Sequence, residues 1–217
     1  MKTYLFMLLF LGFCLNTPTT QAQNIATNAA DSTKSYTRLE DALKDPDKVF
    51  RLDLSNQMFK SFPFEIMKFK NLQYLSLRND HFLSIPKEIS ELKNLKTLDL
   101  SGNDFSVLPK EFTQLKSLEE LYLNQDKNLN LNMDFYVLGQ LPKLRILHLE
   151  GDGLKKLPKS ILRLTHLEQL YLNDNDFRKV PPILKNIKSL QYIDLKGNKF
   201  PPLTPKNSNE FGVRIDF

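Results

Sequence analysis

The side chains of this chain that could do chemistry are three histidines, His81, His148 and His166, and the acids near them. His148 and Glu150 are two residues apart, so on a β-strand both would lie on one face. A zinc site needs three or four ligands, and a catalytic triad needs a nucleophile beside the histidine. We therefore expect no metal site and no enzyme activity, with a hydrolase that uses His148 and Glu150 as the alternative.

The segment 126–134 places oxygen-bearing side chains at every second residue, as calcium-binding loops do. Such a loop needs a glycine at its sixth position and a glutamate at its twelfth, where this chain has Leu131 and Val137. We therefore expect no calcium here, and no cofactor elsewhere because the sequence has no glycine-rich phosphate loop. Asn132 is interpreted instead as the cap of a slightly longer convex helix over 134–140, which absorbs three extra residues of this repeat.

The composition is typical of a folded domain. The 217 residues are 41% hydrophobic and 25% charged and include 16 phenylalanines, which argues against a disordered chain. A single cysteine excludes an internal disulfide scaffold. A formal charge of +5 is too small to indicate nucleic-acid binding unless the basic residues cluster on one face.

The elements that must position these side chains are repeats with a period of 23 residues. Each repeat begins with leucines in the pattern LxxLxL, as in LKTLDLSGN and LEQLYLNDN. Alternation in Leu98-Asp99-Leu100 predicts a short strand with both leucines on one face. The fourth repeat is three residues longer than the others, and the repeats start at 49, 72, 95, 118, 144, 167 and 190.

This pattern resembles the leucine-rich repeat family over residues 49–203, most closely its bacterial exported forms with LPxxIxxL second halves, as in IPKEISEL at 85–92. The resemblance implies an α/β fold: a right-handed solenoid shaped as a horseshoe arc, with a parallel concave sheet and short helical or 3-10 convex segments. It also implies protein–protein interaction as the common role. No repeat buries its apolar side alone, so stacking of the repeats makes one core.

A polar residue follows each predicted strand and forms a second repeated column, the ladder. An asparagine there can bond backbone groups of the turn, next to the same residue of the neighbouring coil. Aspartate lacks the amide donor, so we expect an imperfect ladder. Its members are Gln57, Asp80, Asn103, Asp126, Asp152, Asn175 and Asn198.

Residues 1–22 predict a secretory signal peptide, with Lys2, an apolar run over 4–15, and a cleavage site after Ala22. As a helix the run spans about 18 Å, against about 30 Å of membrane hydrocarbon, so we expect no transmembrane anchor. Lipidation of Cys14 is an alternative. We expect export to the periplasm, the cell surface or the medium.

Both ends of a repeat array need covers. We interpret 23–34 as a flexible leader and 35–48 as a capping helix, with Tyr36, Leu39 and Leu43 on one face. The seven repeats then occupy 49–212. Residues 213–217 alternate and are expected to pair as a final edge strand.

The same alternation identifies the side chains that face the concave surface. Tyr122, His148 and Tyr171 take the same position in consecutive strands, roughly 5 Å apart, and tyrosine is frequent among interface hot spots. Two alternatives are that the rings only stack on one another, or that Tyr122 and Tyr171 bind sugar rings. The predicted binding residues are Tyr74, Glu120, Tyr122, Ile146, His148, Glu150, Tyr171, Tyr192 and Asp194.

Lysines recur on the predicted convex side, for example Lys70, Lys93 and Lys116, and are interpreted as a solvated face. Contact with an acidic cell-envelope surface is the alternative. The expected partner is a protein or, as the alternative, an envelope glycan, bound by a monomer.

Overall fold

The computed structural model describes residues 33–201 and 212–217. The predicted signal peptide at 1–22, the leader up to residue 32 and part of the seventh repeat, 202–211, lie outside the described residues.

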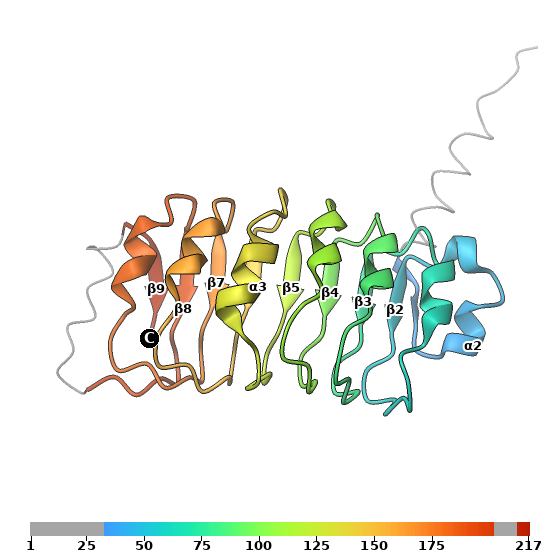
Figure 1. The fold of residues 1–217 in the computed structure, drawn as a ribbon, viewed down its shortest axis with the longest axis horizontal. Helices are drawn as coiled ribbons and strands as arrows, with labels where there is room; N and C mark the ends of the chain where they lie inside the picture. Colours follow the sequence, from blue (N-terminus) through green and yellow to red (C-terminus); the bar gives the residue numbers. More distant parts are fainter. Residues whose placement is uncertain (1–32, 202–211) are drawn as a thin grey trace, which may run out of the picture.

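In the described part of the chain, nine parallel strands form one sheet in the order of the sequence (Figure 1). This confirms the expected solenoid, in which each repeat contributes one strand and the next repeat in the sequence supplies the neighbouring strand. The strands are β1 (Ser35–Tyr36), β2 (Arg51–Asp53), β3 (Tyr74–Ser76), β4 (Thr97–Asp99), β5 (Glu120–Tyr122), β6 (Ile146–His148), β7 (Gln169–Tyr171), β8 (Tyr192–Asp194) and β9 (Arg214–Asp216).

Short helical segments cover one side of the sheet (Figure 1). Each 3-10 segment of the repeats directly follows a proline, which fits a first turn because its missing N–H needs no partner there. The segments are η2 (Phe64–Lys68), η3 (Lys87–Glu91), η4 (Lys110–Gln114), η5 (Lys159–Arg163) and η6 (Pro182–Asn186).

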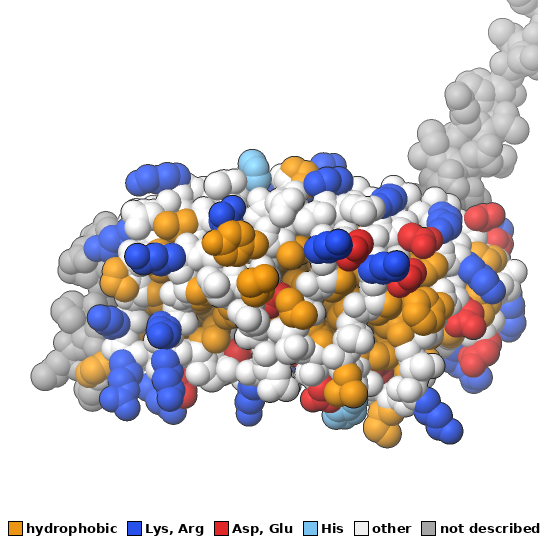
Figure 2. Space-filling view, in the orientation of Figure 1, with side chains coloured by type: hydrophobic (Ala, Val, Ile, Leu, Met, Phe, Trp, Pro, Cys, Tyr) orange, Lys and Arg blue, Asp and Glu red, His pale blue; other side chains and the backbone are white. Residues whose placement is uncertain are grey.

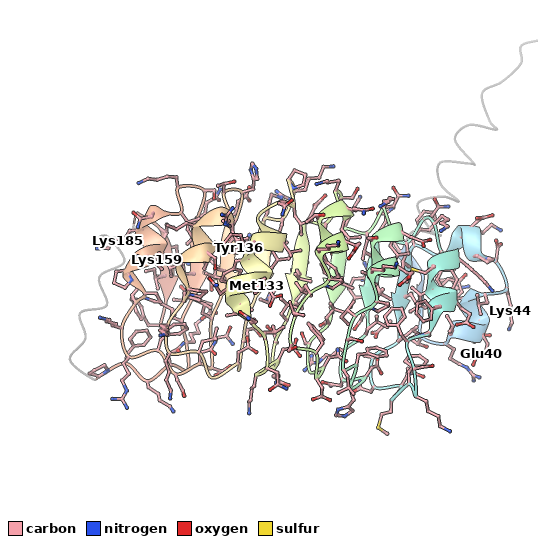
Figure 3. All side chains as sticks on the ribbon, viewed as in Figure 1. Glu40, Lys44, Met133, Tyr136, Lys159 and Lys185 are labelled. Atoms are coloured by element: carbon pink, nitrogen blue, oxygen red, sulfur yellow. The ribbon has the colours of Figure 1, made fainter. Side chains whose placement is uncertain are left out.

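The longer fourth repeat has an α-helix instead, α3 (Leu131–Leu138). Its cap is Asn130, whose side chain accepts a hydrogen bond from the Met133 backbone N–H, so the assignment of the cap to Asn132 was wrong. The helix begins earlier than expected, which places Asn132 inside its first turn. Met133 and Tyr136 project from the outer side of α3 (Figure 3) and are 52% and 46% exposed.

The core lies between the sheet and these segments. In the LxL part of the repeat pattern, both apolar side chains point into this core, as in the third repeat, where Leu98 and Leu100 are fully buried. One continuous cluster of buried side chains extends from Ala42 to Ile215, as stacking of repeats requires.

The N-terminal cover differs from the single helix expected over 35–48. Tyr36 lies in β1, which pairs with β2, and is followed by α2 (Leu39–Ala42) and η1 (Pro46–Lys48). The free edge of β2 exposes backbone groups that need partners, and β1 supplies them. Pro46 then breaks the helical run. At the other end, β9 pairs with β8 and makes the last strand of the described sheet.

Candidate functional site

The register of the sheet arranges the outward side chains in two rows, one from the first and one from the third residue of each strand. We call this surface the concave face. The first row is Arg51, Tyr74, Thr97, Glu120, Ile146, Gln169, Tyr192 and Arg214, and the third-residue row is Asp53, Ser76, Asp99, Tyr122, His148, Tyr171, Asp194 and Asp216.

Three aromatic rings stack at the centre of the concave face. The ring centroids of Tyr122 and His148 are 3.8 Å apart with an interplanar angle of 11°, and those of His148 and Tyr171 are 4.3 Å apart with an angle of 7°. Both faces of the imidazole are therefore covered, and its side chain is only 9% exposed. The rings do stack on one another, as one alternative proposed.

The two nitrogens of His148 each meet a carboxylate. Nε2 lies 3.1 Å from Glu120 Oε1, and Nδ1 lies 3.2 Å from Glu150 Oε1. An ionised carboxylate only accepts hydrogen bonds, so an imidazolium with two N–H groups satisfies both contacts. We call Glu120, Tyr122, His148, Glu150 and Tyr171 the central cluster.

Hydrogen bonds within the central cluster perturb its acids. Glu120 accepts from His148 and, at 2.8 Å, from the Tyr122 hydroxyl, and the His148 hydrogen bond lowers the pKa of Glu120. Burial, reinforced by the Glu120 acceptor, raises the pKa of Tyr122. The carboxylate is therefore held in its charged form and the phenol in its neutral form.

This geometry does not support the hydrolase alternative. A general base needs a ring nitrogen that can reach a substrate or nucleophile. The hydrogen bonds of His148 in the described structure go to Glu120 and Glu150, and the ring lies between two tyrosines. Nor do three or more His, Cys, Asp or Glu side chains gather anywhere in the described residues in a way that could hold a metal ion.

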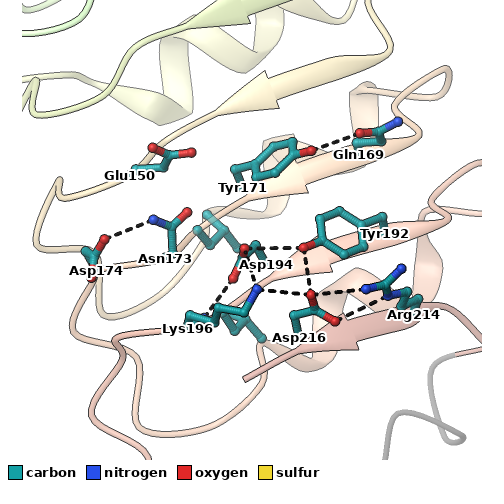
Figure 4. A network of polar contacts seen from close by, with 12 residues as sticks. Glu150, Gln169, Tyr171, Asn173, Asp174, Tyr192, Asp194, Lys196, Arg214 and Asp216 are labelled. Atoms are coloured by element: carbon teal, nitrogen blue, oxygen red, sulfur yellow. Dashed lines mark hydrogen bonds and ion pairs between the residues drawn. The ribbon is translucent and has the colours of Figure 1, made fainter.

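A second polar cluster lies beside the first, over β7, β8 and β9 (Figure 4). The Tyr192 hydroxyl donates to Asp216 at 3.1 Å and to Asp194 at 3.3 Å, and burial is the main cause that raises the pKa of Tyr192. Lys196 pairs with both aspartates, and Arg214 pairs with Asp216. Two cations thus balance two carboxylates within this C-terminal network.

The structure brings most of the predicted residues together but leaves one apart. The Tyr171 and Tyr192 rings make a T-shaped contact with centroids 5.5 Å apart, and Ile146 lies between Glu120 and Gln169 in the first row. Tyr74 is two strands from Tyr122, and its ring packs instead under the Arg51 guanidinium at 4.2 Å.

Sequence reasoning missed Asn124, which ties two repeats together at the central cluster. Its Nδ2 donates to Glu150 Oε2 at 3.2 Å, and its Oδ1 accepts from the Glu150 backbone N–H at 2.9 Å. Asn124 lies two residues after Tyr122, so extending the alternation past the end of the strand could have found it.

The charges of the concave face are unevenly distributed. The outward side chains of β4–β7 include Asp99 and Glu120 but no lysine or arginine, and Glu150 follows β6. Basic side chains stand on the flanks, with Arg51 at one end and Arg214 at the other. Even with His148 counted as an imidazolium, Asp99, Glu120 and Glu150 outnumber it, so the centre of this face is acidic in a chain whose formal charge is +5.

The ladder is imperfect, as the sequence predicts. Asn103 uses its whole amide: Oδ1 accepts from the Phe82 N–H, and Nδ2 donates to the carbonyls of Leu77 and Leu100. Asp126 Oδ1 accepts from the Asn103 N–H at 2.8 Å, but its Oδ2 is buried without a partner.

The other aspartates of the ladder repeat this arrangement. Oδ2 is also buried without a hydrogen-bond partner in Asp80 and Asp152. Burial raises the pKa of Asp126 to about 8 and that of Asp152 to about 7, and it also raises the pKa of Asp80.

None of the helices in the described residues has the length and apolar character needed to cross a membrane.

Comparison with known proteins identifies the repeats. The family model for a leucine-rich repeat region matches residues 48–135, and the leucine rich repeat model matches residues 142–200. No curated protein matches the chain. A solved leucine-rich repeat protein of Leptospira interrogans is 30% identical with a TM-score of 0.50, over 76% of this chain and 53% of that one.

A chain from the solved structure of the Drosophila Toll–Spätzle complex is 20% identical with a TM-score of 0.61, over 76% of this chain and 22% of that chain. This second likeness supports the fold. The chain thus spans about half the length of the Leptospira protein and less of the Drosophila chain.

Proposed function

Because the chain carries leucine-rich repeats over residues 48–135 and 142–200, we propose that it is a non-enzymatic module that binds a protein partner on its concave face. The observation that carries this proposal is the central cluster. Its three rings are stacked and its histidine is held by two carboxylates before any partner arrives. Side chains that are already ordered lose little entropy on binding, and tyrosine is favoured at interface centres.

The charge of this surface specifies the partner further. Asp99, Glu120 and Glu150 face outward with no lysine or arginine among the outward residues of β4–β7. A partner segment that carries lysine or arginine complements this surface, and complementary charge gives specificity and faster association. The C-terminal network is already neutralised by Lys196 and Arg214, so it offers less charge to a partner.

Crosslinking and mass spectrometry in the native envelope test this proposal. Tyr122→Ala with Tyr171→Ala removes two of the three rings, and we expect a protein crosslinked to concave residues in the wild type to be lost. Met133→Ala with Tyr136→Ala is the control, because both side chains are exposed on the outer side of α3. Equal recovery of that partner by the concave variant contradicts the proposal.

The alternatives predict other outcomes. Sugar stacking needs free ring faces, whereas His148 covers one face of Tyr122 and one face of Tyr171, and Tyr192 makes a T-shaped contact with Tyr171. Glycan binding would appear as competition by soluble oligosaccharides. A purely structural role would appear as no change of any crosslinked partner in the double tyrosine variant.

We further propose that the protein is exported, on the basis of the signal-like pattern at 1–22. N-terminal sequencing of the protein recovered from the envelope or medium should find Gln23 as the first residue. Protein that keeps Met1 and stays inside the cell contradicts export. A lipid-sized mass on Cys14 would favour the lipidation alternative.

A further inference from the structure

The loops between the ladder and the convex segments change character along the solenoid, and we call this surface the loop edge. In the first repeats it exposes apolar side chains, with Met58 at 69% and Leu83 at 80% exposed. In the later repeats it is basic. Figure 2 shows lysine and arginine side chains gathered along one end of the lower edge and hydrophobic side chains along the other.

Repeat positions show that this basic end is a local feature. The third and fourth residues after each ladder residue lie on the loop edge. In the fifth and sixth repeats these two positions hold Lys155-Lys156 and Arg178-Lys179. The same two positions in the first three repeats hold one cation, Lys60, and otherwise serine, leucine and valine. Like charges are thus set on adjacent coils, whose strands are about 5 Å apart, and their repulsion falls when an anion lies between them.

A cavity lies among these cations. It has a volume of about 380 Å³ and is lined by Lys155, Asp176, Arg178, Lys179 and Lys199. Lys199 Nζ lies 2.6 Å from Asp176 Oδ1, and this hydrogen bond lowers the pKa of Asp176. Four cations and one carboxylate give the lining a net charge of +3.

We propose that this cavity, the basic pocket, binds a phosphate or sulfate group carried on a small polar molecule such as a sugar. An arginine fork can bind two oxygens of such a group, and lysines supply further charge-assisted hydrogen bonds. The volume lies within the range of small-molecule sites, so it holds more than a bare oxyanion. The pocket is on the loop edge, separate from the concave face, and does not depend on the proposed protein partner.

Calorimetric titration of the purified protein at low salt tests the proposal. The probes are glucose 6-phosphate, inorganic phosphate, inorganic sulfate and uncharged glucose. We expect glucose 6-phosphate to bind more tightly than either inorganic ion, glucose not to bind, and added salt to weaken binding. The two inorganic ions separate a free-ion source of the ligand from an ester.

The discriminating variant is Arg178→Glu with Lys179→Glu, for which we expect affinity to fall about tenfold or more. Lys87→Glu with Lys110→Glu makes the same change of charge at exposed residues of η3 and η4, and should alter affinity about twofold or less. Both pairs are exposed, and thermal unfolding checks that each variant folds. Absence of saturation by every anionic probe, or equal losses in the two variants, overturns the proposal.

Discussion

Two acidic side chains of one repeat, Glu120 and Asp126, are six residues apart and have opposite surroundings. Glu120 lies on the concave face and accepts hydrogen bonds from His148 and Tyr122, and its pKa is lowered. Asp126 lies in the ladder with one buried oxygen unpartnered, and burial raises its pKa to about 8. The difference teaches that hydrogen-bond donors and burial decide what a carboxylate does in this solenoid. With donors it remains a charged surface group, and when it is buried without them it lowers the stability of the fold.

The asparagines of the ladder make the same point from the other side. Asn103 gives one backbone acceptor contact and two donor contacts from one side chain. Asp126 takes the equivalent place one repeat later and can only accept while it is ionised. The acids of the concave face accept hydrogen bonds from neighbouring side chains. The unpartnered oxygen of a ladder aspartate could make a hydrogen bond to a carbonyl only if the carboxyl group were protonated and donated it.

Asn103→Asp should break this contrast with the largest effect. It removes the donor to the carbonyls of Leu77 and Leu100 and buries a new carboxylate. Two buried carbonyls lose their donor, and each buried group left without its partner costs about 1–3 kcal/mol, so we expect the free energy of unfolding to fall by about 2–6 kcal/mol. Urea unfolding at pH 7 measures it. The control Asn132→Asp, at an exposed residue, should change stability by about 0.5 kcal/mol or less.

Asp126→Asn with Asp152→Asn should act in the opposite direction. Each change replaces an unpartnered buried oxygen with an amide that can donate to nearby carbonyls, as Asn103 does. We expect the double variant to gain about 1–3 kcal/mol in unfolding free energy at pH 8. Asp47→Asn changes an exposed carboxylate and should leave stability unchanged. A loss of stability in the double variant contradicts the assigned role of the ladder.

The same aspartates should make the wild type less stable as the pH rises. In the folded state Asp126 and Asp152 have pKa values of about 8 and about 7, against 3.8 when unfolded, so the folded state binds more protons between these values. Their contribution is complete below about pH 4 and is lost progressively as the pH rises from there to the folded pKa values of about 7 and about 8, by up to about 1.4 kcal/mol per pH unit for each group. Urea unfolding at pH 5, 6, 7 and 8 measures this slope, which should flatten in the Asp126→Asn, Asp152→Asn variant.

The sequence predicts those features that depend on the repeat alone. A fixed period and alternation place Tyr122, His148 and Tyr171 in one row, and the register agrees. The burial of His148 and its two carboxylate contacts depend on how closely the rings stack, which no pattern encodes. β1 forms because the edge of β2 has backbone groups that need hydrogen-bond partners, and no side-chain pattern in the sequence indicates this strand. The basic pocket lies in loops without alternation, where repeat spacing alone does not say which side chains converge.

Glu120→Gln tests the concave side of the comparison and should have the smallest effect. It removes the charge at one of the two carboxylates that hold His148 but keeps an acceptor for the Tyr122 hydroxyl. Because the pKa of Glu120 is lowered in the folded state, its contribution is present above the unfolded value of 4.5 and lost as the pH falls below it. We expect a loss of about 1 kcal/mol at pH 6 that shrinks as the pH falls below 4.5, the reverse of the ladder aspartates. Glu65→Gln, at an exposed residue of η2, is the control and should show no such pH dependence. A Glu120→Gln loss that grows on acidification would mean that His148 is not held by this carboxylate.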